Sequence, residues 1–94
     1  MEDYIIQICP GRYLYRYNGF YSTTSHLTET VSFKSFESAD NMLVRIEQAE
    51  YRPNGMDIWD WAQSTAQELF NLKSMCKDAC VKKRIMEIKN VEDE

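Results

Sequence analysis

The chain has 94 residues, a length that indicates one domain with a thin core. Hydrophobic residues make up 44% of it, which argues against a natively disordered chain. The formal charge of −4 argues against a general nucleic-acid binder, because basic side chains that neutralise phosphates supply most non-specific affinity for nucleic acids. No apolar run approaches the roughly 18 residues of a membrane span, so we expect no membrane helix.

The start of the chain and its cysteines predict a cytoplasmic protein. The first eight residues (MEDYIIQI) carry two acids and no basic segment, which is atypical of a secretory signal. Three cysteines, an odd number, favour a reducing compartment over a disulfide framework.

The first third of the chain predicts an antiparallel meander of strands. Residues 4–9 (YIIQIC) are β-branched and aromatic, and the Pro10–Gly11 pair after them suits a type II turn. A second strand is expected at about residues 12–17. Asn18–Gly19 then supplies the two positive-φ residues of a type I′ hairpin, so a third strand begins at Phe20.

The hydrophobic period changes from strand to helix in the mid-30s. Residues 30–33 (TVSF) predict a short fourth strand at an edge of the sheet. Ser35 is a good N-cap, with Glu37 in the first turn. Apolar residues then recur at helical spacing, so residues 36–49 predict an amphipathic helix.

The last third predicts helix. Residues 57–89 contain no Gly or Pro and carry an apolar stripe, which indicates a long C-terminal helix or a helix pair. Residues 90–94 form an acidic tail. The expected fold is therefore a single α+β domain over residues 1–94. It has an antiparallel sheet of three to four strands in residues 4–33, one packed helix, and the C-terminal helical segment.

The stretch YLYRYNGFY places a tyrosine at every second position. On a strand, Tyr13, Tyr15 and Tyr17 share one face, and Leu14 lies on the other with its flanking arginines. Either the tyrosine face covers the helix, or the Leu14 face does and the tyrosines form an exposed row. An exposed row stacks on bases or contacts a protein. Because the arginines point away from the rings, protein contact ranks ahead of nucleic-acid contact.

A second aromatic stretch is flanked by acids. Asp57 is expected to cap a helix that carries Asp60 in its first turn. Trp59 and Trp61 lie about 200° apart around that helix. We therefore expect one tryptophan in the core and the other in an acidic-aromatic contact patch.

Basic residues gather after residue 72 and supply an alternative site. On a helix they form a solvated face, or they bind an anion such as a nucleotide or RNA. No glycine-rich loop accompanies them, which excludes a P-loop. The candidates are Lys77, Lys82, Lys83 and Arg84.

The sequence offers no positive sign of catalysis, of a metal or of a cofactor. Cys76 and Cys80 have i, i+4 spacing, but zinc needs four ligands and only Cys9 and His26 remain to complete the set. Buried structural thiols are the simpler interpretation. His26 lies in a polar loop, and its neighbour Ser25 says nothing about convergence in space.

The segments YIIQI, GRYLYRYNGFY and LTETVSFKSFESADNML resemble small accessory proteins encoded by bacteriophages, over residues 4–46. Many such proteins inhibit host defence systems, among them anti-CRISPR and anti-restriction proteins, by occluding a basic surface of their target. The resemblance implies a class of function and assigns no residue roles.

Together these features predict a non-catalytic inhibitor that docks on a host protein through an acidic-aromatic face. The candidate residues are Tyr13, Tyr15, Tyr17, Asp57, Trp59 and Asp60. One alternative is a nucleotide- or RNA-binding module that uses the basic residues. The other is a homodimeric structural or adaptor protein joined through residues 69–88.

Overall fold

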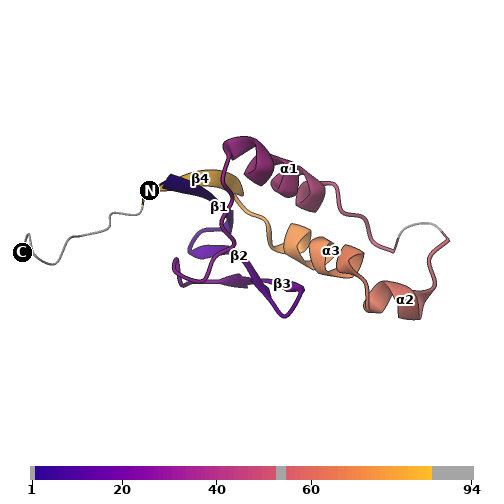
Figure 1. The fold of residues 1–94 in the computed structure, drawn as a ribbon. Coiled ribbons are helices and arrows are strands. Elements are labelled where there is room, and N and C mark those ends of the chain that lie inside the picture. The colour runs from indigo at the N-terminus through magenta and orange to yellow at the C-terminus, as the bar shows by residue number, and fades with distance from the viewer. Residues whose placement is uncertain (1, 53–54, 86–94) are drawn as a thin grey trace, which may run out of the picture.

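The computed structural model describes residues 2–52 and 55–85, and Figure 1 traces them from the N-terminus to the last strand. Three strands come first, three helices follow, and a final strand returns to the sheet. The elements are β1 (Glu2–Cys9), β2 (Arg12–Tyr17), β3 (Phe20–Thr24), α1 (Phe36–Glu47), α2 (Ile58–Ala62), α3 (Thr65–Met75) and β4 (Cys80–Ile85).

The four strands form one antiparallel sheet in the order β3-β2-β1-β4, so the expected α+β class is confirmed. β2 and β3 make a hairpin in which Tyr17 pairs with Phe20. Asn18 and Gly19 both have positive φ, 50° and 84°, as a type I′ turn requires. β4 pairs with β1 from Glu2↔Ile85 to Gln7↔Cys80.

Residues 30–33 lie inside the sheet and not at its edge, which corrects their predicted place. β1 and β2 pair only near their shared turn, with a bulge between Gln7 and Cys9. Where the two strands diverge, Phe33 exchanges two 2.9 Å backbone hydrogen bonds with Tyr4, and Val31 N–H donates to the Leu14 carbonyl. The segment thus satisfies backbone groups that β1 and β2 leave unpaired, and it forms isolated bridges, not a strand.

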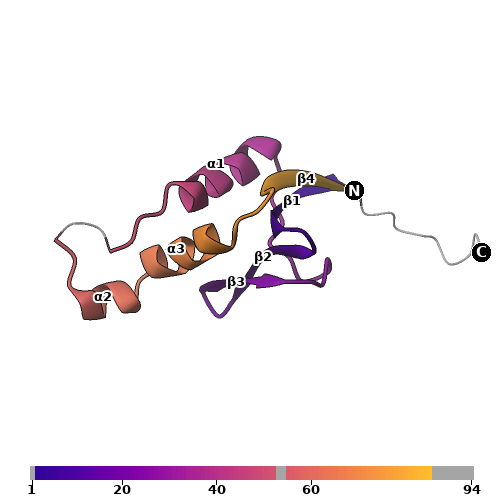
Figure 2. The same cartoon turned by 180° about the vertical axis from the view of Figure 1, so that it is seen from behind.

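Helices α1 and α3 cover one face of the sheet, as Figures 1 and 2 show from opposite sides. The hydroxyl of Ser35 accepts the Ser38 N–H at 3.1 Å, so the expected N-cap of α1 is confirmed. The core combines side chains from both layers. Its buried members are Ile6, Ile8, Leu14, Ala39, Met42, Leu43, Ile46, Leu69 and Leu72.

The prediction of a long helix or a helix pair over residues 57–89 is wrong, because the last helix ends at Met75 and residues 80–85 are strand. α2 ends after one short run, and the Ser64 hydroxyl accepts the Gln67 N–H to start a separate helix, α3. α3 ends at Met75, and Asp78 then takes a positive φ of 55°, which turns the chain. Residues 80–85 form β4 because pairing with β1 outweighs their local helix preference.

The helical dimer seam expected over residues 69–88 loses its basis with that helix. Leu69 and Leu72, at its start, are buried in the chain's own core. Residues 80–85 of the seam are strand. Residues 86–88 and the acidic tail at 90–94 lie outside the described residues.

One arginine ties the two ends of the described chain together. The guanidinium of Arg84 makes a two-pronged contact with Asp3, with Nε to Oδ1 at 2.9 Å and Nη2 to Oδ2 at 2.5 Å. Both side chains are more than four-fifths buried. Nη1 also donates to the Leu27 carbonyl and to the Thr30 hydroxyl. β1, β4 and the loop before α1 are therefore held at one point.

The hydrogen bonds from Arg84 hold the pKa of Asp3 below its ordinary value of 3.8; burial opposes this shift, while a hydrogen bond from Ser32 and the Arg84 charge add to it. The Asp3→Asn substitution leaves the arginine without its counter-ion. We expect the free energy of unfolding at neutral pH to fall by about 1–3 kcal/mol, as measured by urea denaturation.

The pH dependence fixes the sign of this effect. The stabilisation is fully present above pH 3.8 and is lost as the pH falls through the lower folded pKa. The gap between wild type and Asp3→Asn should therefore close in acid. Glu2→Gln is the matched control. Glu2 pairs with Lys83 at the surface, where both side chains are about half exposed, and such exposed ion pairs contribute little to stability. An equal loss in both variants would contradict the assignment.

Candidate protein-binding surface

The short helix α2 stands at the end of the molecule away from the sheet, beyond α3 (Figures 1 and 2). Asp57 caps it, as expected, with Oδ1 accepting the Trp59 N–H at 2.8 Å. The Asp57 carbonyl accepts the Trp61 N–H at 2.9 Å. The capping aspartate thus fixes the first turn and the directions of both tryptophans.

Trp61 anchors α2 to the rest of the protein. It is 8% exposed, and its ring meets Tyr51 edge-on, with centroids 4.8 Å apart. Phe70 of α3 lies against both rings, 5.6 Å from Tyr51 and 6.2 Å from Trp61. Such edge-on pairs add stability beyond the area they bury, so this aromatic cluster holds α2 in place.

Trp59 points the other way and is 75% exposed. The expectation of one core and one exposed tryptophan is therefore confirmed. Asp57 and Asp60 beside it are exposed, and Ile58 is partly exposed. We call these four residues the α2 surface. It combines an exposed indole with two carboxylates.

Of the two arrangements considered for β2, the structure has the one in which the Leu14 face packs on the helices. Leu14 is fully buried. On the opposite face, Tyr13 and Tyr15 are half-buried and Tyr17 is 63% exposed. The rings of Tyr15 and Tyr17 are nearly parallel, with centroids 6.3 Å apart. Tyr17, at the end of this row, is therefore its most exposed member.

Phe20 belongs with this row and was missed from the sequence. It pairs with Tyr17 across the hairpin turn and is equally exposed. The predicted Asn18–Gly19 turn could have revealed it, because the two residues that flank a two-residue turn lie opposite each other on one side of the sheet. We call Tyr15, Tyr17 and Phe20 the hairpin surface.

The six residues predicted as one acidic-aromatic face form two separate groups. The α2 surface lies beyond α3, while the tyrosines lie on β2 within the sheet (Figure 1). A partner would have to be large to contact both. The α2 surface and the tyrosine row are therefore separate sites.

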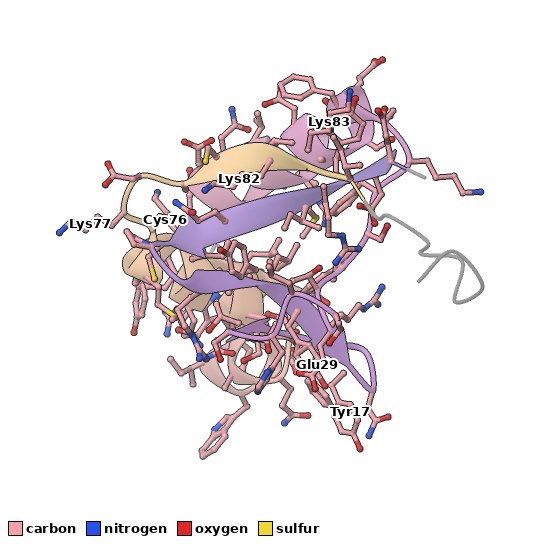
Figure 3. All side chains as sticks on the ribbon, turned by 90° about the vertical axis from the view of Figure 1, so that its left-hand side faces the viewer. Tyr17, Glu29, Cys76, Lys77, Lys82 and Lys83 are labelled. Carbon is pink, nitrogen blue, oxygen red and sulfur yellow. The ribbon has the colours of Figure 1, made fainter. Side chains whose placement is uncertain are left out.

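The basic residues do not share a helical face, because β4 is a strand. Lys82 and Arg84 alternate with Lys83 on opposite faces of it. Arg84 is engaged by Asp3, and the Lys83 ammonium lies 3.1 Å from Glu2. Figure 3 shows Lys82 and Lys83 along β4, and Tyr17 towards the opposite edge of the sheet. Lys77 is exposed in the turn before β4.

The three cysteines are free and half-buried. Burial, followed by the charges of Glu47 and Cys9, raises the pKa of Cys76. This lowers its thiolate fraction at neutral pH, the reverse of what activates a nucleophile. His26 is exposed. Within residues 2–52 and 55–85, no three His, Cys, Asp or Glu side chains are grouped to hold a metal ion.

Comparison of the chain with family profiles, with curated proteins and with solved structures finds no match. In the described part of the chain, every helix is too short or too polar to cross a membrane.

The two tryptophans should differ sharply in their effect on folding. Trp61→Ala opens the aromatic cluster and should cost about 3–5 kcal/mol in the free energy of unfolding. Trp59→Ala removes an exposed ring and should change it by less than about 0.5 kcal/mol. Urea denaturation followed by circular dichroism measures both. A comparable loss in Trp59→Ala would show that its ring is part of the packing.

Proposed function

We propose that this protein is a non-catalytic binding protein that docks on a partner protein through the α2 surface. The observation that carries the proposal is the exposure of Trp59, 75%, on a helix that a buried tryptophan holds in place. Burying such a ring in a partner removes a large apolar area from water. The loss of backbone entropy on binding is low, because the helix that carries the ring is already folded. Tryptophan is also among the residues enriched at interface hot spots.

The charge around Trp59 favours a basic partner surface. Asp57 and Asp60 flank the ring, and residues 35–72 hold seven acids against two basic residues. A carboxylate pair at the rim of an apolar contact steers association with a positive patch and disfavours acidic partners. Because Asp57 already accepts the Trp59 N–H, Asp60 has the freer carboxylate.

Inhibition is one form that this binding would take. The resemblance of residues 4–46 to phage accessory proteins implies an inhibitor of a host defence protein, such as an anti-CRISPR or anti-restriction protein. A ring-and-carboxylate surface suits that role, because covering a basic nucleic-acid-binding patch blocks it without chemistry. The structure offers less support for nucleotide or RNA binding, since Arg84 and Lys83 already have carboxylate partners.

The test is affinity capture from a host lysate with a double variant, Trp59→Ala with Asp60→Lys. We expect it to lose the captured partner while keeping the wild-type circular dichroism spectrum and unfolding midpoint, because both side chains are exposed. Quantitative mass spectrometry of the captured proteins measures the loss, expected to exceed tenfold.

The matched control makes the same chemical changes elsewhere. Phe36→Ala with Glu37→Lys removes a ring that is 55% exposed and reverses a neighbouring acid at the start of α1. Because the Phe36 ring also meets Tyr4 edge-on at 6.2 Å, the unfolding midpoint of this variant is measured alongside capture. This variant should retain the partner. Equal capture by the wild type and the Trp59 variant would refute the proposal, as would equal loss in both variants.

A further inference from the structure

Among residues 2–52 and 55–85, no strand pairs with the outer edge of β4. β4 is the last strand of the sheet, with β1 on one side only. Tyr4 of β1 directs its N–H and C=O towards Phe33, away from β4. In an antiparallel ladder the residue opposite Tyr4 must then direct its own groups outward, and that residue is Lys83. The period of two extends this to Val81 and Ile85.

The other edge of the sheet is closed by side chains. On β3, the Tyr21 N–H donates to the Glu68 carboxylate of α3 at 2.6 Å. The Thr23 carbonyl accepts from the Arg12 guanidinium at 3.0 Å. Both contacts occupy backbone groups that a further strand would need. Within the described residues, the outward groups of Val81, Lys83 and Ile85 have no such partners.

The charges and apolar side chains along β4 determine which kind of strand can pair with this edge. A second copy in antiparallel register about Lys83 would bring Lys83 against Lys83 and Lys82 against Arg84. Because Lys83 and Arg84 are each paired with a carboxylate of β1, the second copy would bring no counter-ion to Lys82, whereas an acidic strand does. Ile85 is 65% exposed and Val81 half-buried, so apolar positions lie at both ends of the basic centre. Lys82 is exposed, and no described side chain forms an ion pair with it.

We propose that the β4 edge binds an extended acidic segment of a partner protein as a fifth strand. Main-chain hydrogen bonds to Val81, Lys83 and Ile85 supply affinity. A carboxylate opposite Lys82, which has no ion-pair partner among the described side chains, supplies selectivity together with aliphatic residues opposite Val81 and Ile85. Lys83 already pairs with Glu2 and contributes mainly its backbone groups. This site is separate from the α2 surface and does not depend on the function proposed for it.

The probe is the blocked peptide TITEEVT, whose central ITEEV matches residues 85 to 81 in antiparallel register. Titration into 15N-labelled protein at low salt should shift and protect the amides of Val81, Lys83 and Ile85 in preference to those of β3. The peptide TITQQVT has the same shape without charge and should bind at least threefold more weakly.

Lys83→Pro tests the backbone contribution. Proline removes the outward N–H and leaves the β1 hydrogen bonds in place, since those involve the neighbouring residues. Binding of TITEEVT should fall at least tenfold relative to Lys83→Ala, the control that loses the charge and keeps the N–H. Should the proline variant fail to fold, N-methylation of alternate peptide amides must abolish binding to the wild-type protein.

Three results would overturn the proposal. The first is the absence of β4 amide shifts at millimolar TITEEVT. The second is binding that neither proline nor peptide N-methylation weakens. The third is a concentration dependence of the β4 amide shifts without peptide, which would assign the edge to a second copy.

Discussion

The pairing of β1 with β4 is the interaction on which the rest of the structure depends. It joins residues about 80 positions apart, and the ion pair between Arg84 and Asp3 holds one end of the ladder. With β4 in place, β1 becomes an inner strand, and Ile6 and Ile8 are fully buried beneath the helices. The helices between β2 and β4 must therefore fit the span that this pairing sets. A thin core of this kind gains much when the first and last described strands pair in one sheet.

Local chemistry predicted the first half of the fold well. A turn formed by Asn18 and Gly19, or a cap formed by Ser35, depends on a few adjacent residues and so can be read from the sequence. The last third could not be read in this way. Residues 80–85 contain two lysines and an arginine and lack Gly and Pro, so they suit a helix until β1 is considered. The usable signal was long-range, in the match of Glu2 and Asp3 to Lys83 and Arg84.

The candidate site likewise has features that adjacent residues determine and features that depend on long-range contacts. The angle between Trp59 and Trp61 is a property of one helix, so the sequence predicted a buried and an exposed indole. Which face of β2 is buried depends on the helices, so the sequence left the role of Tyr13 open. Whether β2 and α2 share a surface depends on the whole fold. Grouping their residues as one face was the error that spacing alone could not reveal.

The two proposed surfaces have opposite charge, which raises the question of whether copies of the chain bind each other head to tail. The geometry of the two surfaces disfavours this. The β4 edge needs an extended strand with free N–H and C=O groups, whereas the α2 segment is helical and its first N–H groups are held by Asp57. The α2 segment of another copy would bring carboxylates to β4 but could not form the main-chain hydrogen bonds of a fifth strand. The β4 strand of another copy, in turn, would offer Trp59 no apolar pocket. The two proposed surfaces therefore suit different partner segments, a strand with free main-chain groups for the β4 edge and an apolar pocket for Trp59.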